Sequence, residues 1–268
     1  MKRNDWAGGF WAKAAAFLLA VVLVPVTLVY GAAFALSYGG ELRGDFYASG
    51  LCSSAVYEEM RSVYGSYNYY VENGQANIYE NFPDWYPADD RYTNVRFSME
   101  DKAGNLLFDN RGEGDIPVTG WESAIDRDNV IFRTYVAADY PAQDSVYWAL
   151  RIYDVMAELA PHAAAVVIAC AAAELFLFIF LARAAGRRAG REEAVVGWQE
   201  KIPFDLYAAV VLGGAMLVVA AASGTEDTFQ GFEPIMIAAV LACCAAAYAL
   251  FLAFWMTLCA RVKLGRWW

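Results

Sequence analysis

Residues 14–37 read AAAFLLAVVLVPVTLVYGAAFALS, a run of 24 residues without one charged side chain. About 20 apolar residues in a helix span the hydrocarbon layer of a bilayer, which is roughly 30 Å thick. Because lipid offers no partner to peptide groups, such a run has to close its own hydrogen bonds as a helix. The stretch therefore predicts a transmembrane helix. Ala33, Phe34 and Ala35 resemble a signal-peptide cleavage site, but the run exceeds the usual apolar region of about 7–15 residues, which favours an uncleaved anchor.

Three further apolar runs occupy residues 160–182, 206–223 and 235–260. The whole chain is 59% hydrophobic and only 19% charged, a balance too apolar for an ordinary soluble domain. Each run is about long enough to cross the bilayer, so the sequence predicts a bundle of four transmembrane helices.

The basic residues predict the orientation of these helices. Lys and Arg gather in 1–13, 183–205 and 261–268, whereas the loop 224–234 has Asp and Glu but no Lys or Arg. The positive-inside rule then places both termini in the cytoplasm of a cell-membrane protein. The expected segments are a cytoplasmic N-terminus (1–13), helix 1 (14–37), an extracellular domain (38–159), helix 2 (160–182), a cytoplasmic loop (183–205), helix 3 (206–223), an extracellular loop (224–234), helix 4 (235–260) and a cytoplasmic tail (261–268).

The long segment 38–159 is expected to fold as an extracellular α+β domain. It carries 9 Lys/Arg, 21 Asp/Glu and 14 tyrosines, and is long enough for a compact core. Its first part predicts a helix that continues from the first membrane helix and carries on one face Leu42, Phe46, Val56, Met60 and Val63. Its second part predicts an antiparallel meander with a type I turn from Asp101 to Gly104. The expected strands are 95–99, 105–109, 129–137 and 145–153.

Three stretches resemble a known family. The hairpin NVRFSMEDKAGNLLFDN (94–110) resembles the central strands of PAS-like, Cache-type extracellular sensor domains. The segment GWQEKIPFDLY (197–207) and the tail RVKLGRWW (261–268) are similar to parts of multi-pass sensor histidine kinases of Gram-positive bacteria. The resemblance spans the whole chain in layout.

The resemblance implies the ligand-sensing and signal-transmitting input module of a two-component sensor histidine kinase. It implies a homodimer in the bilayer, an extracellular ligand or envelope protein, and a response regulator reached only through a kinase core. That core, and so any enzymatic activity or cofactor, is expected to be absent from this chain, and no nucleic-acid partner is expected. The interface anchors expected in the tail are Arg261, Lys263, Arg266, Trp267 and Trp268.

Two polar residues stand in or beside the second membrane run. Glu174 lies near its middle, where a carboxyl is costly to ionise and usually faces protein. It is either a proton-linked switch between helices or a protonated side chain with one interhelical hydrogen bond. His162 follows Pro161 at the outer end, and is either an interfacial polar residue or a group that senses pH outside.

The extracellular segment offers further candidates. An aromatic-rich stretch predicts either a ligand pocket or an ordinary core, because Tyr and Trp line both. The ligand-binding candidates are Tyr67, Tyr69, Tyr79, Trp85, Phe97 and Phe108. Acidic groups such as Asp89 and Asp90 match no defined calcium loop and are read as solvated surface. Cys52 is either a buried thiol or a cross-link between two subunits.

Two other functions compete with the sensor. The chain is alternatively a small transporter or accessory subunit that uses Glu174, or a stand-alone membrane protein that presents an extracellular binding domain. The transporter lacks inverted repeats and a charged pathway in the sequence. The stand-alone protein has no need of the kinase-like tail.

Overall fold

The computed structural model describes residues 9–72, 93–118, 124–127, 130–187, 202–203, 206–211, 213–214, 216 and 234–265, and at 62, 64–72 and 124–127 it describes the backbone alone. The chain divides into two compact units. We call Met1–Ala32, Pro161–Thr228 and Ile235–Trp268 the helical unit, and Ala33–Ala160 with Phe229–Pro234 the sheet unit. Each is described by itself.

Three long apolar helices run through the described residues. They are α1 (Phe10–Gly39), α4 (Ser145–Ala184) and α6 (Pro234–Lys263), with mean hydropathies of 2.4, 2.6 and 2.5 over their most apolar 18 residues. Each is long and apolar enough to cross a membrane. Only 6–17% of the residues in those windows are buried inside the protein, as expected for helices that face lipid. The membrane prediction is thus supported for three of the four runs.

The predicted helix 206–223 lies largely outside the described residues. Where the backbone is described, at 206–211, 213–214 and 216, it is helical. The four-helix bundle therefore stays a prediction, whereas three candidate spans are observed.

The three helices pack together in the helical unit through an apolar cluster. Its buried members are Ala16 and Ala20 on α1, Leu177 and Leu181 on α4, and Leu252 on α6. The small side chains of α1 permit close approach, which suits helices that associate in lipid by shape and dispersion.

In the sheet unit, the helical conformation of the chain stops after α1. The sequence predicted one continuous helix through Leu42 and Phe46, but α1 ends at Gly39. Gly40 and Gly44 have φ values of +90° and +120°, which favour glycine and end the helical path. A short 3₁₀ helix, η2 (Phe46–Ala48), follows, and α2 (Gly50–Glu72) starts anew. The predicted continuation is wrong for this reason.

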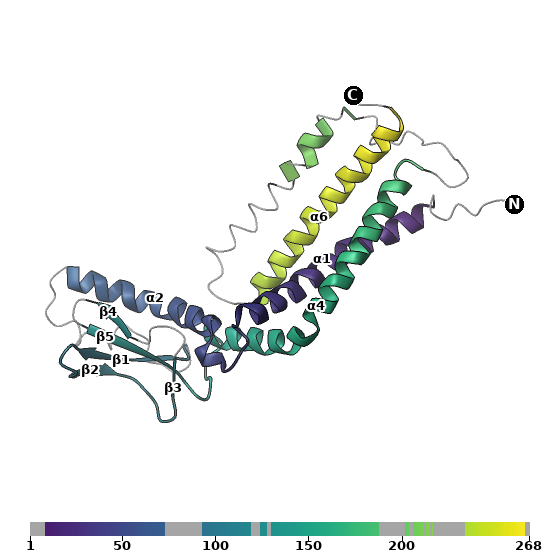
Figure 1. Ribbon diagram of the computed structural model, residues 1–268. Coiled ribbons are helices and arrows are strands. Elements are labelled where there is room, and N and C mark those ends of the chain that lie inside the picture. Colours follow the sequence, from purple (N-terminus) through teal and green to yellow (C-terminus); the bar gives the residue numbers. More distant parts are fainter. Residues whose placement is uncertain are drawn as a thin grey trace. The chain divides into compact units, whose positions relative to one another are not determined.

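A five-stranded antiparallel sheet forms the body of this unit (Figure 1). Its strands are β1 (Val95–Asp101), β2 (Leu106–Asp109), β3 (Ile116–Pro117), β4 (Ala124–Arg127) and β5 (Val130–Val136). The order is β2-β1-β5-β3, and β4 also pairs with β5. The predicted hairpin and the predicted strand 129–137 are confirmed, whereas β3 and β4 were not predicted.

The turn of the hairpin is the expected one. The Gly104 N–H donates to the Asp101 carbonyl at 2.9 Å, and Gly104 has a φ of +85°. The Asp101 side chain accepts from the Asn105 N–H at 2.8 Å, and this second hydrogen bond also stabilises the turn.

The core lies between one face of the sheet and α2, which runs across that face (Figure 1). Phe97 and Phe132 supply the sheet side, and Val56, Met60 and Val63 of α2 supply the helix side. The helical spacing of the last three follows the sequence prediction, because positions three or four apart share a face.

The predicted strand 145–153 is wrong, because these residues open α4. The buried side chains there are Val146, Ala149 and Tyr153, three or four positions apart, which is the period of a helix. Aromatic and β-branched residues suggested a strand, but burial against the core selects the helix. The predicted boundary between domain and membrane, at 159–160, falls inside this single 40-residue helix.

Candidate functional site

The first turn of α4 is bound to the start of β1. The Asn94 N–H donates to Asp144 Oδ2, and Asn94 Nδ2 donates to Asp144 Oδ1, both at 2.6 Å. The Asn94 side chain also bonds both backbone groups of Ala142, donating to its carbonyl at 2.8 Å and accepting from its N–H at 2.9 Å. Asn94 is fully buried, so this small network fixes the position of the N-terminal end of α4 relative to the sheet.

Asp144 is also the N-cap of α4. Its Oδ1 accepts from the Tyr147 N–H at 3.0 Å, which satisfies one of the unpaired donors of the first turn. A negative charge at this end is favourable because the helix dipole is positive there.

A second carboxyl reaches the same helix end from α2. Glu59 Oε1 accepts from the Ser145 N–H at 3.1 Å. Burial raises the pKa of Glu59 above its ordinary value, and the nearby charge of Asp144 adds to the rise. The N-terminal end of α4 is therefore hydrogen-bonded to both α2 and the start of β1, through the carboxyl groups of Glu59 and Asp144.

Within the sheet unit, α4 contacts the segment that follows α1. The Tyr153 hydroxyl on α4 donates to the Gly44 carbonyl at 2.8 Å. The rings of Tyr153 and Phe46 meet edge to face with centroids 5.5 Å apart. A shift of α4 along its axis would therefore disturb the segment that follows α1.

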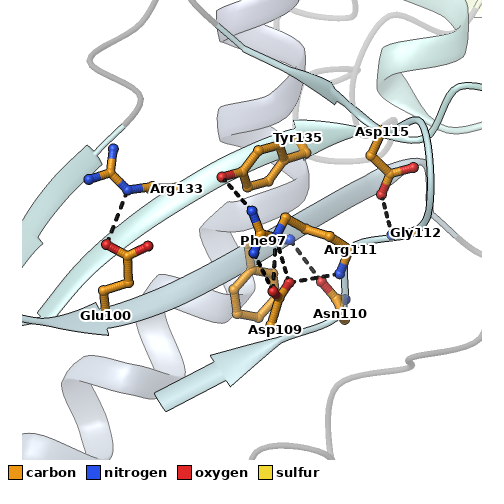
Figure 2. A network of polar contacts seen from close by, with 9 residues as sticks. All are labelled: Phe97, Glu100, Asp109, Asn110, Arg111, Gly112, Asp115, Arg133 and Tyr135. Carbon is orange, nitrogen blue, oxygen red and sulfur yellow. Dashed lines mark hydrogen bonds and ion pairs between the residues drawn. The ribbon is translucent and has the colours of Figure 1, made fainter. Parts of the chain in front are cut away.

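A polar network lies at the end of β2, in the loop toward β3 (Figure 2). Arg111 Nε donates to both carboxylate oxygens of Asp109, at 2.8 and 2.9 Å. Its guanidinium stands 5.0 Å from the ring centroid of Tyr135 on β5 and donates to that hydroxyl at 3.2 Å. The Arg111 contact holds the pKa of Asp109 below its ordinary value. Asn110 Oδ1 accepts from the Phe97 N–H at 2.8 Å, which joins this loop to β1.

The sheet face opposite the core carries polar and charged side chains. Alternation along β1 and β5 directs Arg96, Ser98, Arg133 and Tyr135 to that face, because the core residues occupy the positions between them. Arg133 Nε donates to Glu100 Oε2 at 3.3 Å. Arg96 and Ser98 are buried, and Ser98 Oγ has no hydrogen-bond partner among the described residues. Arg133 and Tyr135 are the partly exposed members of this set.

Of the six predicted ligand-binding aromatics, the structure describes the side chains of two, Phe97 and Phe108. Phe97 is fully buried in the core and packs against the partly buried Phe108, with ring centroids 5.0 Å apart and the rings tilted by 30°. Tyr67 and Tyr69 lie on α2, where only the backbone is described. Tyr79, Trp85 and the acidic pair 89–90 lie outside the described residues. Phe97 and Phe108 thus pack the core, and a ligand role for the six stays a prediction.

Cys52 lies fully buried on α2. Burial raises the pKa of its thiol to about 12, with a smaller contribution from the charge of Asp45. Of the two interpretations from the sequence, this environment matches the buried thiol, because a covered and neutral thiol does not exchange disulfides readily.

Glu174 faces protein within the helical unit. The Tyr248 hydroxyl of α6 donates to Glu174 Oε2 at 2.7 Å, so α4 and α6 share a polar contact between apolar stretches. Four residues along α4, Phe178 stacks on Trp255 with centroids 4.7 Å apart. His162, in contrast, is exposed on α4.

The basic residues of the tail contact the far end of α4. Lys263 Nζ donates to the carbonyls of Ala182, Arg183 and Ala185, at 2.7, 2.9 and 3.1 Å. Ala182 and Arg183 lie in the last turn of α4 and Ala185 directly follows it. A positive charge complements the helix dipole at this end. From α1, Lys13 Nζ donates to the Arg187 carbonyl.

Arg261 is buried and donates to the Ile202 carbonyl. Two of the five predicted anchors, Lys263 and Arg261, therefore bind backbone carbonyls inside the helical unit. Arg266, Trp267 and Trp268 lie outside the described residues.

Sequence reasoning missed Asn94, Asp144 and Arg111, and it counted Glu59 among the acidic groups of a solvated surface. Asp144 before an apolar stretch of helical period was a usable signal of an N-cap. The partnership of Asn94 with a residue 50 positions later had no local signal. Among the described residues no group of three or more His, Cys, Asp or Glu side chains is placed to hold a metal ion.

No family model matches the chain, and neither a curated protein nor a solved structure matches it.

Proposed function

We propose that this protein is a membrane sensor, in which the sheet unit binds an extracellular ligand and α4 carries the resulting change into the bilayer. The observation that supports this most directly is the hydrogen-bonded junction of Asn94 and Asp144 at the head of α4. From that junction α4 runs without interruption for 40 residues and contributes to both units.

The junction gives the signal a physical route. Asn94 immediately precedes β1, whose residues pair along their whole length with β5. A ligand that changes the position of β1 or β5 therefore acts on Asp144 through two hydrogen bonds of 2.6 Å. A buried, fully bonded junction passes on such a shift, whereas a flexible loop would absorb it.

The polar sheet face is the proposed ligand site. The partly exposed Arg133 guanidinium on this face has donors to offer to an anionic or carbonyl-bearing molecule. The ligand shifts the helices only by its difference in affinity between two arrangements. Changing a 1:99 population to 99:1 takes about 5.5 kcal/mol of such preference.

The resemblance of the hairpin, the segment 197–207 and the tail to sensor histidine kinases suggests the output. In this proposal the helices act as the input module of a two-component sensor, in a cell membrane, as a homodimer with both termini inside. The kinase core would lie beyond residue 268 or on another chain.

A chimaera tests this function. Residues 1–268 are joined to a histidine-kinase core in several helical registers, and autophosphorylation is measured in membrane vesicles. We expect Asn94→Ala and Asp144→Asn to change the basal rate several-fold in the coupled registers. Asp139→Asn, at an exposed position just before α4, is the matched control and should leave the rate unchanged.

Equal rates for the junction variants and the control in every register would contradict the proposal. Membrane insertion and circular dichroism of each variant show whether it has folded. The ligand face is tested separately by Arg133→Gln, which should abolish thermal stabilisation by whichever small anion stabilises the unaltered protein.

A further inference from the structure

A carboxyl group lies within the apolar part of the helical unit and is only partly satisfied. Glu174 Oε2 accepts from the Tyr248 hydroxyl at 2.7 Å. Its other oxygen, Oε1, is buried and has no hydrogen-bond partner among the described residues. The sequence around Glu174 is CAAAELFLFIF, in which all residues except Glu174 are apolar.

The charged form of Glu174 has little support in these surroundings. A carboxylate transferred to an apolar interior needs paired charges and several donors. Among the described residues, Tyr248 is the one titratable group that acts on this carboxyl. The α1 side chains in the neighbouring cluster are Ala, Phe, Val and Leu, which have no charge or donor to offer.

The observed geometry matches a neutral acid. A protonated carboxyl has a carbonyl oxygen that accepts and a hydroxyl that carries the proton. Oε2, with the tyrosine hydroxyl directed at it, takes the place of the carbonyl oxygen. Oε1, which receives no donor, is left to carry the proton.

The contact sits in a longer seam between α4 and α6. Phe178 stacks on Trp255 one turn further along, and Lys263 binds the last carbonyls of α4. The hydrogen bond from Tyr248 is thus one of several contacts that fix the same alignment of the two helices.

We propose that Glu174 is a proton-binding site within the membrane, and that its protonated form holds α4 against α6 through Tyr248. Loss of the proton places a carboxylate in the apolar seam and favours a looser arrangement in which water reaches the carboxylate. The ligand of this site is the proton itself. The proposal goes beyond the sensor function and does not depend on it.

Infrared spectroscopy of the full chain in lipid nanodiscs tests the protonation. A protonated carboxyl absorbs in a C=O stretching region separate from that of carboxylates. Carboxyls in water ionise above about pH 5, so few others contribute there at neutral pH. We expect a neutral-carboxyl band at about pH 7 that Glu174→Gln removes.

Two further variants sharpen the assignment. Tyr248→Phe should keep the band but move it to higher frequency, because the carbonyl oxygen loses its hydrogen bond. Glu158→Gln is the matched control, since Glu158 is exposed on the same helix, and should leave the band unchanged. Absence of any band removed by Glu174→Gln, while circular dichroism shows the unaltered chain folded, would overturn the proposal.

Thermal unfolding at increasing pH tests whether protonated Glu174 holds α4 against α6. The unaltered protein should lose melting temperature relative to Glu174→Gln as the pH rises, because only the unaltered chain acquires the buried charge. Tyr248→Phe separates this effect from ionisation of the tyrosine, since a variant without the phenol should still show the loss. Parallel curves of melting temperature against pH for the unaltered protein and Glu174→Gln would refute this holding role, even if the infrared band is present.

Discussion

The side chain of Asn94 and the carboxylate of Asp144 meet across 50 positions of sequence, with Asn94 Nδ2 donating to Asp144 Oδ1 at 2.6 Å. The pair joins the start of the sheet to the start of α4, which is 40 residues long. Because both residues also bond backbone groups, the junction combines a strand start, a loop and a helix cap.

Replacing Asp144 should destabilise the sheet unit. Asp144→Ala removes the N-cap of α4 and takes the acceptor from the buried Asn94 N–H and from one of the two N–H groups of its side-chain amide. We expect a cost of about 3 kcal/mol in the free energy of unfolding. Denaturant unfolding followed by circular dichroism measures the loss. Asp139→Ala, at an exposed position, should change the free energy of unfolding by less than about 0.5 kcal/mol. A similar small value for Asp144→Ala would show that the junction contributes little.

Glu59 should give the stability a distinct pH dependence. Its folded-state pKa is raised above the ordinary 4.5, mainly by burial and further by the charge of Asp144. The neutral form is therefore favoured in the folded protein, and its contribution to stability is lost as the pH rises from about 4.5 through the raised pKa. Glu59→Gln should remove this decline in melting temperature. Glu58→Gln, which alters an exposed ion pair with Arg61, should retain it.

Arg111 should control the ionisation of Asp109. In Arg111→Ala the carboxylate loses its bidentate partner, so the pKa of Asp109 should rise toward its ordinary value, as measured by nuclear magnetic resonance titration. Because the pair is largely exposed, stability should fall by only about 0–1 kcal/mol. Asp101 provides an internal control, since its low pKa comes from hydrogen bonds with Asn105 and should not move.

Cys52 should resist thiol reagents in the folded protein. Complete burial and a pKa of about 12 together predict alkylation at neutral pH at least about a thousandfold slower than for a free thiol. The measurement uses a chain in which Cys52 is the only cysteine. Its matched control carries Ser54→Cys with Cys52→Ala, since Ser54 is exposed on the same helix. Equal rates, or a disulfide-linked dimer through Cys52, would contradict the prediction.

Local patterns in the sequence were sufficient for part of this fold. The hairpin of β1 and β2 follows from alternation around an Asp–Gly turn, and β5 follows from alternation alone. Apolar length identified three of the helices. Residues 145–153 were assigned wrongly because their aromatic and β-branched composition suits strands, whereas the pattern of burial that makes them helical depends on the sheet beside them.

In the candidate sites, likewise, some residues could be found from local sequence and their partners could not. Glu174 was found from the sequence because one acid in an apolar run is visible locally, but its partner Tyr248 is 74 positions away. Arg111 and Asp109 are close in sequence, yet their importance depends on Tyr135 from another strand. Such partners follow from tertiary packing, which no short window of sequence contains.

The three hydrogen bonds from Lys263 to the last carbonyls of α4 also bear on how the chain is assembled. Before residue 263 is synthesised, these three carbonyls lack the ammonium group that binds them in the finished protein. The contact between the ends of α4 and α6 can therefore form only after the whole of α6 has been made, later than α4 itself.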